Sequence, residues 1–194
     1  MWLLIAVYAI CGAQDYFMVI HVVAFALDQG VGQVLAGSLL ALMGVMGLAG
    51  VVTSGFLADS FGAKNPTVIS FVMRVAIFAP LLYFHDTVSI AILVLLYGVT
   101  LPVTAPLTVV FAGNMFGSAR LGAVSGVLNM VHQMAGGVGA VAGALIFDRW
   151  GAYDSAFLLM MLMSLVAIGA TLLIRERLDS RRGGSTLTTV SAQC

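Results

Sequence analysis

Six long apolar segments occupy almost the whole chain, and they constrain its fold more than any other feature of the sequence. A bilayer core about 30 Å thick requires roughly 20 apolar residues per helix. The segments that meet this length lie near residues 2–27, 32–57, 66–84, 88–112, 122–147 and 153–174. Because 61% of the residues are hydrophobic and only 8% are charged, the sequence predicts an all-α membrane protein with six transmembrane helices.

The basic residues outside these segments are distributed unequally between the two sides. Lys64, Arg120 and the arginines after residue 174 share one side, whereas Arg149 lies on the other. The positive-inside rule therefore predicts a multi-pass protein of the cell (inner) membrane with both termini in the cytoplasm. We expect one six-helix domain over residues 1–175. The polar residues 176–194 are expected to form a disordered cytoplasmic tail.

Charge and cysteine content argue against several function classes. Eight basic residues balance eight acidic ones, so no nucleic-acid partner is expected. Cys11 and Cys194 are too few for a disulfide framework or a zinc site, and no metal or cofactor is predicted. Ser125 precedes a glycine, as in intramembrane serine proteases, but the only later histidine, His132, falls on the same helix. With no other enzyme motif present, we expect no catalytic residues.

Polar side chains inside the apolar segments are the candidate functional residues, because such groups are costly in a bilayer and by default mark a pathway or a pair. Counted from the segment ends, six of them share a similar depth: Gln14, Asp15, Arg74, Thr100, His132 and Gln133. Secondary transporters bind their substrates at such a level near the midplane. Asn129 lies on the same helical face as His132 and Gln133.

Each of these groups also has a purely structural interpretation. Asp15 and Arg74 either form a buried ion pair that touches no substrate, or line a pathway. His132 is either a neutral packing histidine, bonded to Gln133 or to a neighbouring helix, or a group that binds substrate or a proton.

The fourth segment contains threonines at every fourth position and two prolines. Thr100, Thr104 and Thr108 share one helical face, and Pro102 and Pro106 remove backbone donors from the middle of the segment. Such breaks are tolerated in membranes where a cavity or neighbouring groups satisfy the freed carbonyls. The threonines therefore either line a wet cavity or bond to their own helix backbone.

Many of the 22 glycines also lie inside the segments. The four-residue spacing of Gly122 with Gly126, and of Gly139 with Gly143, predicts closely packed helices. On a functional interpretation, the same smooth faces would let helices rock against their partners.

Residues 55–64 read Gly-Phe-Leu-Ala-Asp-Ser-Phe-Gly-Ala-Lys, a polar turn between two apolar segments. This stretch resembles the Gly-x-Leu-Ala-Asp-Arg-x-Gly-Arg-Lys loop of the major facilitator superfamily, which joins the second and third helices of each six-helix half. The matching positions are Gly55, Leu57, Ala58, Asp59, Gly62 and Lys64. The resemblance implies a conformational gate formed by Gly55, Asp59, Gly62 and Lys64, in which the aspartate engages a helix N-terminus.

Residues 116–122, 143–157 and 21–30 are similar to the C-terminal half of monocarboxylate-porter-like members of that superfamily. The resemblance implies that the six segments correspond to helices seven to twelve of a carrier, and that the third and sixth are peripheral. Arg74 then lies on a peripheral helix. The implied substrate pathway comprises Gln14, Asp15, Thr100, Thr104, Asn129, His132 and Gln133. A small organic anion, moved together with a proton, is the implied solute.

A carrier of this family needs two pseudo-symmetric halves, and the motif at residues 55–64 occurs once. Three explanations stay open: a fragment of a longer protein, a half that pairs with a second copy or with another half, and an inactive remnant. We therefore expect a secondary carrier that works by alternating access. The alternative is a half-carrier without transport that serves as a structural or interaction module in the bilayer.

Overall fold

The computed structural model describes residues 1–174, and these residues fold into seven α-helices. The helices are α1 (Trp2–Asp28), α2 (Gln33–Phe61), α3 (Lys64–Leu81), α4 (Thr87–Thr100), α5 (Thr104–Phe116), α6 (Leu121–Trp150) and α7 (Asp154–Leu173), with a short 3-10 turn, η1 (Ser118–Arg120), before α6. The predicted all-α class is thereby confirmed. The predicted tail, residues 176–194, lies outside the described residues.

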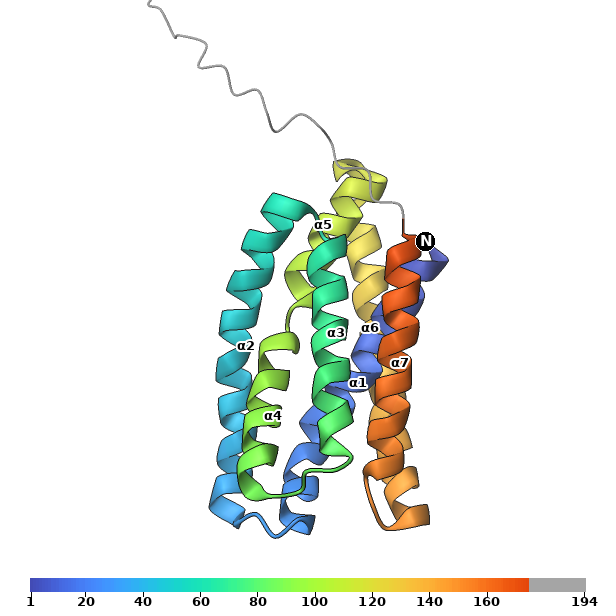
Figure 1. Cartoon of the computed structure of the whole chain (residues 1–194). Coiled ribbons are helices and arrows are strands. Elements are labelled where there is room, and N and C mark those ends of the chain that lie inside the picture. The colour runs from blue at the N-terminus through green and yellow to red at the C-terminus, as the bar shows by residue number, and fades with distance from the viewer. Residues whose placement is uncertain (175–194) are drawn as a thin grey trace, which may run out of the picture.

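The helices run up and down in one bundle (Figure 1). α1 packs mainly against α6 and α7, α3 against α7 and α4, and α2 against α4. The N-terminus, the α2–α3 connection, the α5–α6 connection and the end of α7 lie at one end of the bundle (Figure 1). Lys64 and Arg120 therefore share that end, and Arg149 lies at the other, as the charge distribution predicted.

Four of the described helices are long and apolar enough to cross a membrane: α1, α2, α6 and α7. α3 has 18 residues and carries Lys64 and Arg74, while α4 and α5 have 14 and 13 residues. Together, α4 and α5 run most of the length of the bundle (Figure 1). Six membrane spans therefore remain a prediction.

The fourth apolar segment is two helices rather than one. α4 ends at Thr100, three residues form a turn, and α5 begins at Thr104. Pro102 has no N–H to donate to the carbonyl of Gly98, which instead accepts a 3.2 Å bond from the amide of Leu101. The ring of a proline inside a helix also clashes with the carbonyl four residues earlier. Leu101, the residue before Pro102, keeps helical dihedral angles of φ −58° and ψ −58°. The break therefore follows from the sequence Thr-Leu-Pro-Val.

The polar turn expected over residues 55–64 is much shorter in the structure. α2 continues through Gly55 and Asp59 to Phe61, and only Gly62 and Ala63 separate it from α3. Gly62 has φ 76° at the end of α2, a conformation that glycine adopts without strain. The residues before it stay helical because leucine and alanine favour helix and Ala58 packs in the core.

Glycines bring two helix pairs into backbone contact. A Cβ atom added to Gly139 of α6 would collide with the backbone of Ala13 in α1, and one added to Gly50 of α2 would collide with the backbone of Val99 in α4. The predicted close packing is confirmed for Gly139 and Gly143. It is wrong for Gly122 and Gly126, where an added Cβ would meet nothing within 4 Å among the described residues.

Candidate functional site

A buried ion pair between α1 and α3 forms the centre of the polar groups within the bundle. The Nη2 atom of Arg74 lies 2.7 Å from Oδ1 of Asp15, and the side chains are 0% and 7% exposed. The predicted pair thus forms, even though Arg74 lies on α3, a helix that packs mainly against α7 and α4 rather than against α1. A paired geometry is what makes two charges tolerable at this depth.

The guanidinium of Arg74 has further partners on three elements. It donates to Oε1 of Gln14 and to the backbone carbonyl of Thr100, each at 3.0 Å. Its carbon lies 5.1 Å from the ring centre of Tyr97 and 5.4 Å from that of Phe71, within cation–π range. Its Nε has no partner among the described residues. Arg74 is therefore fixed by α1, α3 and the end of α4.

Asp15 is the group on which most of these contacts converge. Its Oδ1 also accepts a 3.1 Å bond from the hydroxyl of Tyr97. Its Oδ2 lies 3.2 Å from Nε2 of His132 and accepts a 3.4 Å bond from the thiol of Cys11. The carboxylate thereby joins α1, α3, α4 and α6.

Gln14 extends the same network to α7. Its Nε2 donates to the backbone carbonyl of Met160 and to Oγ of Ser164, both at 2.8 Å. Because Gln14 and Asp15 are adjacent in α1, their side chains leave the helix about 100° apart and reach different neighbours. Gln14 therefore points towards α7, while Asp15 also reaches α6.

One side of the network faces a pocket. A space of about 380 Å³ is lined by Asp15, Tyr16, Val19, Leu101, His132 and Gln133. The hydroxyl of Tyr16 donates a 2.5 Å bond to Oε1 of Gln133. The side chain of His132 is 16% exposed, so its imidazole connects the buried Asp15 with the pocket. The wall of this pocket combines a carboxylate, a phenol, an imidazole and an amide.

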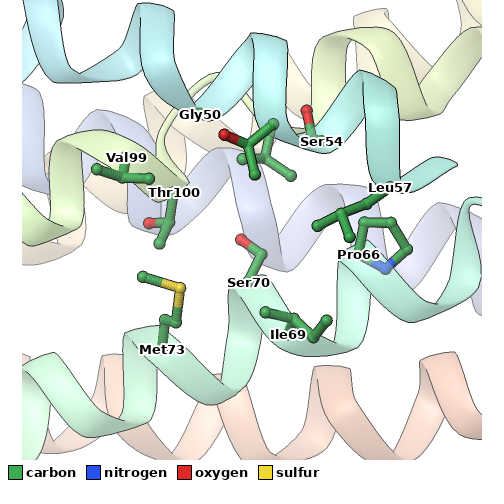
Figure 2. A pocket seen from close by; sticks show the side chains of 11 residues that line it. Gly50, Ser54, Leu57, Pro66, Ile69, Ser70, Met73, Val99 and Thr100 are labelled. Carbon is green, nitrogen blue, oxygen red and sulfur yellow. The ribbon is translucent and has the colours of Figure 1, made fainter.

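A second, smaller cavity of about 60 Å³ lies between α2, α3 and the end of α4. Thr100 and Ser70 extend into it, and Ser54 lies at its edge on α2 (Figure 2). Its volume is enough for a few water molecules. Thr100, one of the predicted pathway residues, therefore lines this cavity rather than the pocket beside Asp15.

The structure joins most of the predicted site residues and leaves two outside both cavities. Gln14, Asp15, Arg74, Thr100 and His132 belong to one hydrogen-bonded network, and Gln133 lies in its pocket. Thr104 and Asn129 line neither of the two cavities.

Two of the three threonine hydroxyls of the fourth segment bond to backbone. That of Thr100 donates to the carbonyl of Tyr97 and that of Thr108 to the carbonyl of Thr104. These two bonds agree with the second alternative from the sequence, in which the threonines bond to their own helix backbone.

Four polar residues of the network were not predicted as site residues: Cys11, Tyr16, Tyr97 and Ser164. Cys11 precedes Asp15 by one helical turn, which is a signal that the sequence offered. Tyr16 follows Asp15 directly but resembles an ordinary apolar side chain in a membrane segment. Ser164 gave no signal, because its contact with Gln14 joins residues 150 positions apart.

The predicted gate residues lie at the end of the bundle that carries both Lys64 and Arg120. Asp59 is exposed in the last turns of α2, and Gly55 lies inside that helix. The Nζ of Lys64 donates a 2.6 Å bond to the carbonyl of Leu172 in α7. Whether Asp59 engages a helix N-terminus stays a prediction.

Comparison with known proteins gives a consistent picture. A family model described as Major Facilitator Superfamily matches residues 2–190. The chain is 25% identical over 170 residues to "Uncharacterized MFS-type transporter YcxA" of Bacillus subtilis (strain 168), covering 84% of this chain and 40% of that protein. It is 28% identical over 146 residues to "Monocarboxylate transporter 12-B" of Danio rerio, covering 72% of this chain and 30% of that protein. The chain thus spans less than half the length of these relatives.

Proposed function

We propose that this chain, which belongs to the major facilitator superfamily, is the C-terminal half of a membrane transporter that moves a small organic anion by alternating access. The observation that carries the proposal is the pocket beside Asp15, because a buried network of charged and polar side chains forms part of its wall. Secondary carriers bind substrate near the bilayer midplane, where irregular helices and polar side chains meet. The turn between α4 and α5 contributes Leu101 to this pocket.

The pocket suits a carboxylate because its own carboxylate is already neutralised. Arg74 compensates the charge of Asp15 at 2.7 Å, so the pair adds no net charge to the wall. The amide group of Gln133 is able to donate hydrogen bonds to an anion. The hydroxyl of Tyr16 and Nε2 of His132 would do so by giving up their present bonds to Gln133 and Asp15. The apolar side chains of Val19 and Leu101 would contact a short hydrocarbon part of the same solute.

A proton as co-substrate is part of the proposal, and its support is the resemblance to monocarboxylate-porter-like carriers. The relative named a monocarboxylate transporter supports the same class of solute at 28% identity. The other half of the carrier would be an N-terminal half that this sequence does not include, or a second copy of this chain. A half-carrier or fragment without transport, serving as a structural or interaction module in the bilayer, is the alternative, and it differs by not moving the anion.

Uptake of labelled acetate, pyruvate and lactate into liposomes containing the 194-residue chain tests the proposal. We expect uptake that an inward-directed proton gradient increases. Gln133→Ala and Tyr16→Phe each remove a hydrogen-bonding group from the pocket, and a lost bond of this kind costs about 0.5–1.5 kcal/mol. We therefore expect roughly three- to tenfold weaker apparent affinity for either variant.

Asn129→Ala is the matched control, because Asn129 lies on α6 one turn before Gln133 and outside the pocket. It should transport like the unchanged chain. Equal loss in all three variants would contradict the assigned pocket. Saturable binding of the same anions without uptake would favour the half-carrier alternative.

A further inference from the structure

A thiol, a carboxylate and an imidazole meet where α1 crosses α6. Sγ of Cys11, Oδ2 of Asp15 and Nε2 of His132 all lie within 4.8 Å of one another. We propose that these three residues form a binding site for a zinc-class divalent cation. The sequence predicted no metal, because the histidine is 117 positions away from Asp15 and only the fold brings them together.

The donor set and its spacing match the chemistry of zinc. Zn²⁺ binds thiolate sulfur at about 2.3 Å, histidine nitrogen at about 2.0–2.1 Å and carboxylate oxygen at about 2.0–2.2 Å, in a tetrahedral arrangement. Donors at those distances from one tetrahedral ion lie roughly 3.3–3.8 Å apart. The carboxylate oxygen already lies 3.2 Å from the imidazole nitrogen and 3.4 Å from the sulfur. The sulfur and the imidazole nitrogen are within 4.8 Å of each other, so the three donors lie close enough to converge on one ion.

The helix crossing holds the three donors in place. Cys11 and Asp15 are four residues apart on α1, so they share one face of that helix. Between them, Gly12 lies directly against the backbone carbonyl of His132, and any added Cβ would collide with it. The position of the imidazole relative to the other two donors is therefore set by contact between the two backbones.

The groups around the donors support binding as well. Arg74 and Tyr97 both bond to Oδ1 of Asp15, which leaves Oδ2 directed at the other two donors. Hydrogen bonds of this kind to a ligating carboxylate fix its orientation and strengthen metal sites. Asp15 and His132 also line the 380 Å³ pocket, which gives a fourth coordination position room for water or an anion.

Binding would release the thiol proton of Cys11 to solvent. Because Arg74 already balances the Asp15 carboxylate, the thiolate and an anion in the fourth coordination position would together balance the charge of the ion. The site itself does not depend on the proposed transport function. The effect of the cation on transport does depend on that function. Asp15 and His132 belong to the cation site and to the solute pocket, so a bound cation would compete with the solute.

Cobalt titration of the full chain in detergent, under reducing conditions, tests the site directly. Co²⁺ substitutes for Zn²⁺ and gives a thiolate-to-cobalt charge-transfer band in the near ultraviolet. We expect this band in the unchanged chain and its disappearance when Zn²⁺ is added. Cys11→Ser should remove the band, and His132→Gln should weaken binding by at least roughly tenfold.

Cys194→Ser is the control, because it removes the chain's other cysteine and should leave the band unchanged. Thermal unfolding provides a second measurement: Zn²⁺ should raise Tm of the unchanged chain and of Cys194→Ser, and leave Tm of Cys11→Ser unchanged. A band that survives Cys11→Ser and is lost in Cys194→Ser would overturn the proposal, as would the absence of both band and Tm shift. These measurements involve no transport, so they can fail while the proposed function holds.

Discussion

The Nζ atom of Lys64 donates a hydrogen bond of 2.6 Å to the backbone carbonyl of Leu172. This contact joins the first residue of α3 to the last turn of α7, where the final carbonyls have no partner within their own helix. A positive charge at a helix C-terminus is also favoured by the helix dipole. The connection between α2 and α3 therefore holds the end of α7 in place.

Removing the charge of Lys64 should loosen that end of α7. With Lys64→Met, the carbonyl of Leu172 loses its donor while the apolar part of the side chain is kept. We expect faster amide hydrogen exchange over residues 170–174 and no change in the middle of α7. Hydrogen exchange with mass spectrometry measures this, and Asn65→Ala serves as the control on the next residue. Unchanged exchange in Lys64→Met would show that other contacts fix the helix end.

Breaking the Asp15–Arg74 pair should destabilise the bundle more than removing it entirely. Asp15→Asn leaves the buried guanidinium without its counter-charge, which costs about 3–5 kcal/mol in comparable buried pairs. The double variant Asp15→Asn with Arg74→Met removes both charges and should recover a large part of that loss. The free energy of unfolding in mixed micelles measures both. Strictly additive losses would contradict a direct pairing.

The crossing of α1 and α6 should be sensitive to a single methyl group. Gly139→Ala places a Cβ against the backbone of Ala13, and the resulting overpacking should cost roughly 1–3 kcal/mol. Gly137→Ala, two residues away on the same helix, meets nothing within 4 Å among the described residues and should be neutral or slightly stabilising. Thermal unfolding compares the two. Equal Tm values would contradict the close crossing.

The start of α4 should make stability depend on pH. Asp86 caps this helix by accepting a 2.9 Å bond from the amide of Ser89, and that bond lowers the pKa of the Asp86 carboxyl. Because the folded pKa lies below the unfolded one, the stabilisation is present above the unfolded pKa and is lost as the pH falls through the folded pKa.

Asp86→Asn keeps a capping side chain but does not titrate, so it should remove this component of the acid dependence. The difference in Tm between the two proteins, followed from neutral to acidic pH, measures it. A difference that stays constant across that range would show that Asp86 does not contribute.

The polar groups of the site were predictable from the sequence because a bilayer makes them exceptional. Gln14, Asp15, Arg74 and His132 stand out in apolar segments, and counting depth along each segment places them at one level. Their pairing was harder to predict, since Arg74 reaches Asp15 from a helix whose main packing partners are α7 and α4 rather than α1. Side-chain length and the direction in which it leaves the helix decide that contact, and neither is visible in hydrophobic periodicity.

The limits of sequence prediction appear at Thr104 and at the motif of residues 55–64. A shared helical face would place Thr104 beside Thr100. The break at Pro102 separates them, because α4 ends at Thr100 and α5 begins at Thr104. In the motif, glycine and aspartate suggested a turn over ten residues, whereas the first seven of them belong to α2, in which Ala58 packs in the core, and Lys64 begins α3. At Thr104 the proline ends the helix that the threonine spacing assumed, and in the motif helix propensity and the packing of Ala58 outweigh the turn residues.

The end of α4 at Thr100 has an electrostatic consequence for the site. The carbonyl that Arg74 contacts there belongs to the C-terminal end of a 14-residue helix, where the aligned peptide dipoles act as about half a negative charge. Arg74 is thus held by roughly one and a half negative charges, of which only the carboxylate can take up a proton. If Asp15 exchanges its partner for a solute or a cation, the interrupted helix still provides Arg74 with a counter-charge that does not titrate.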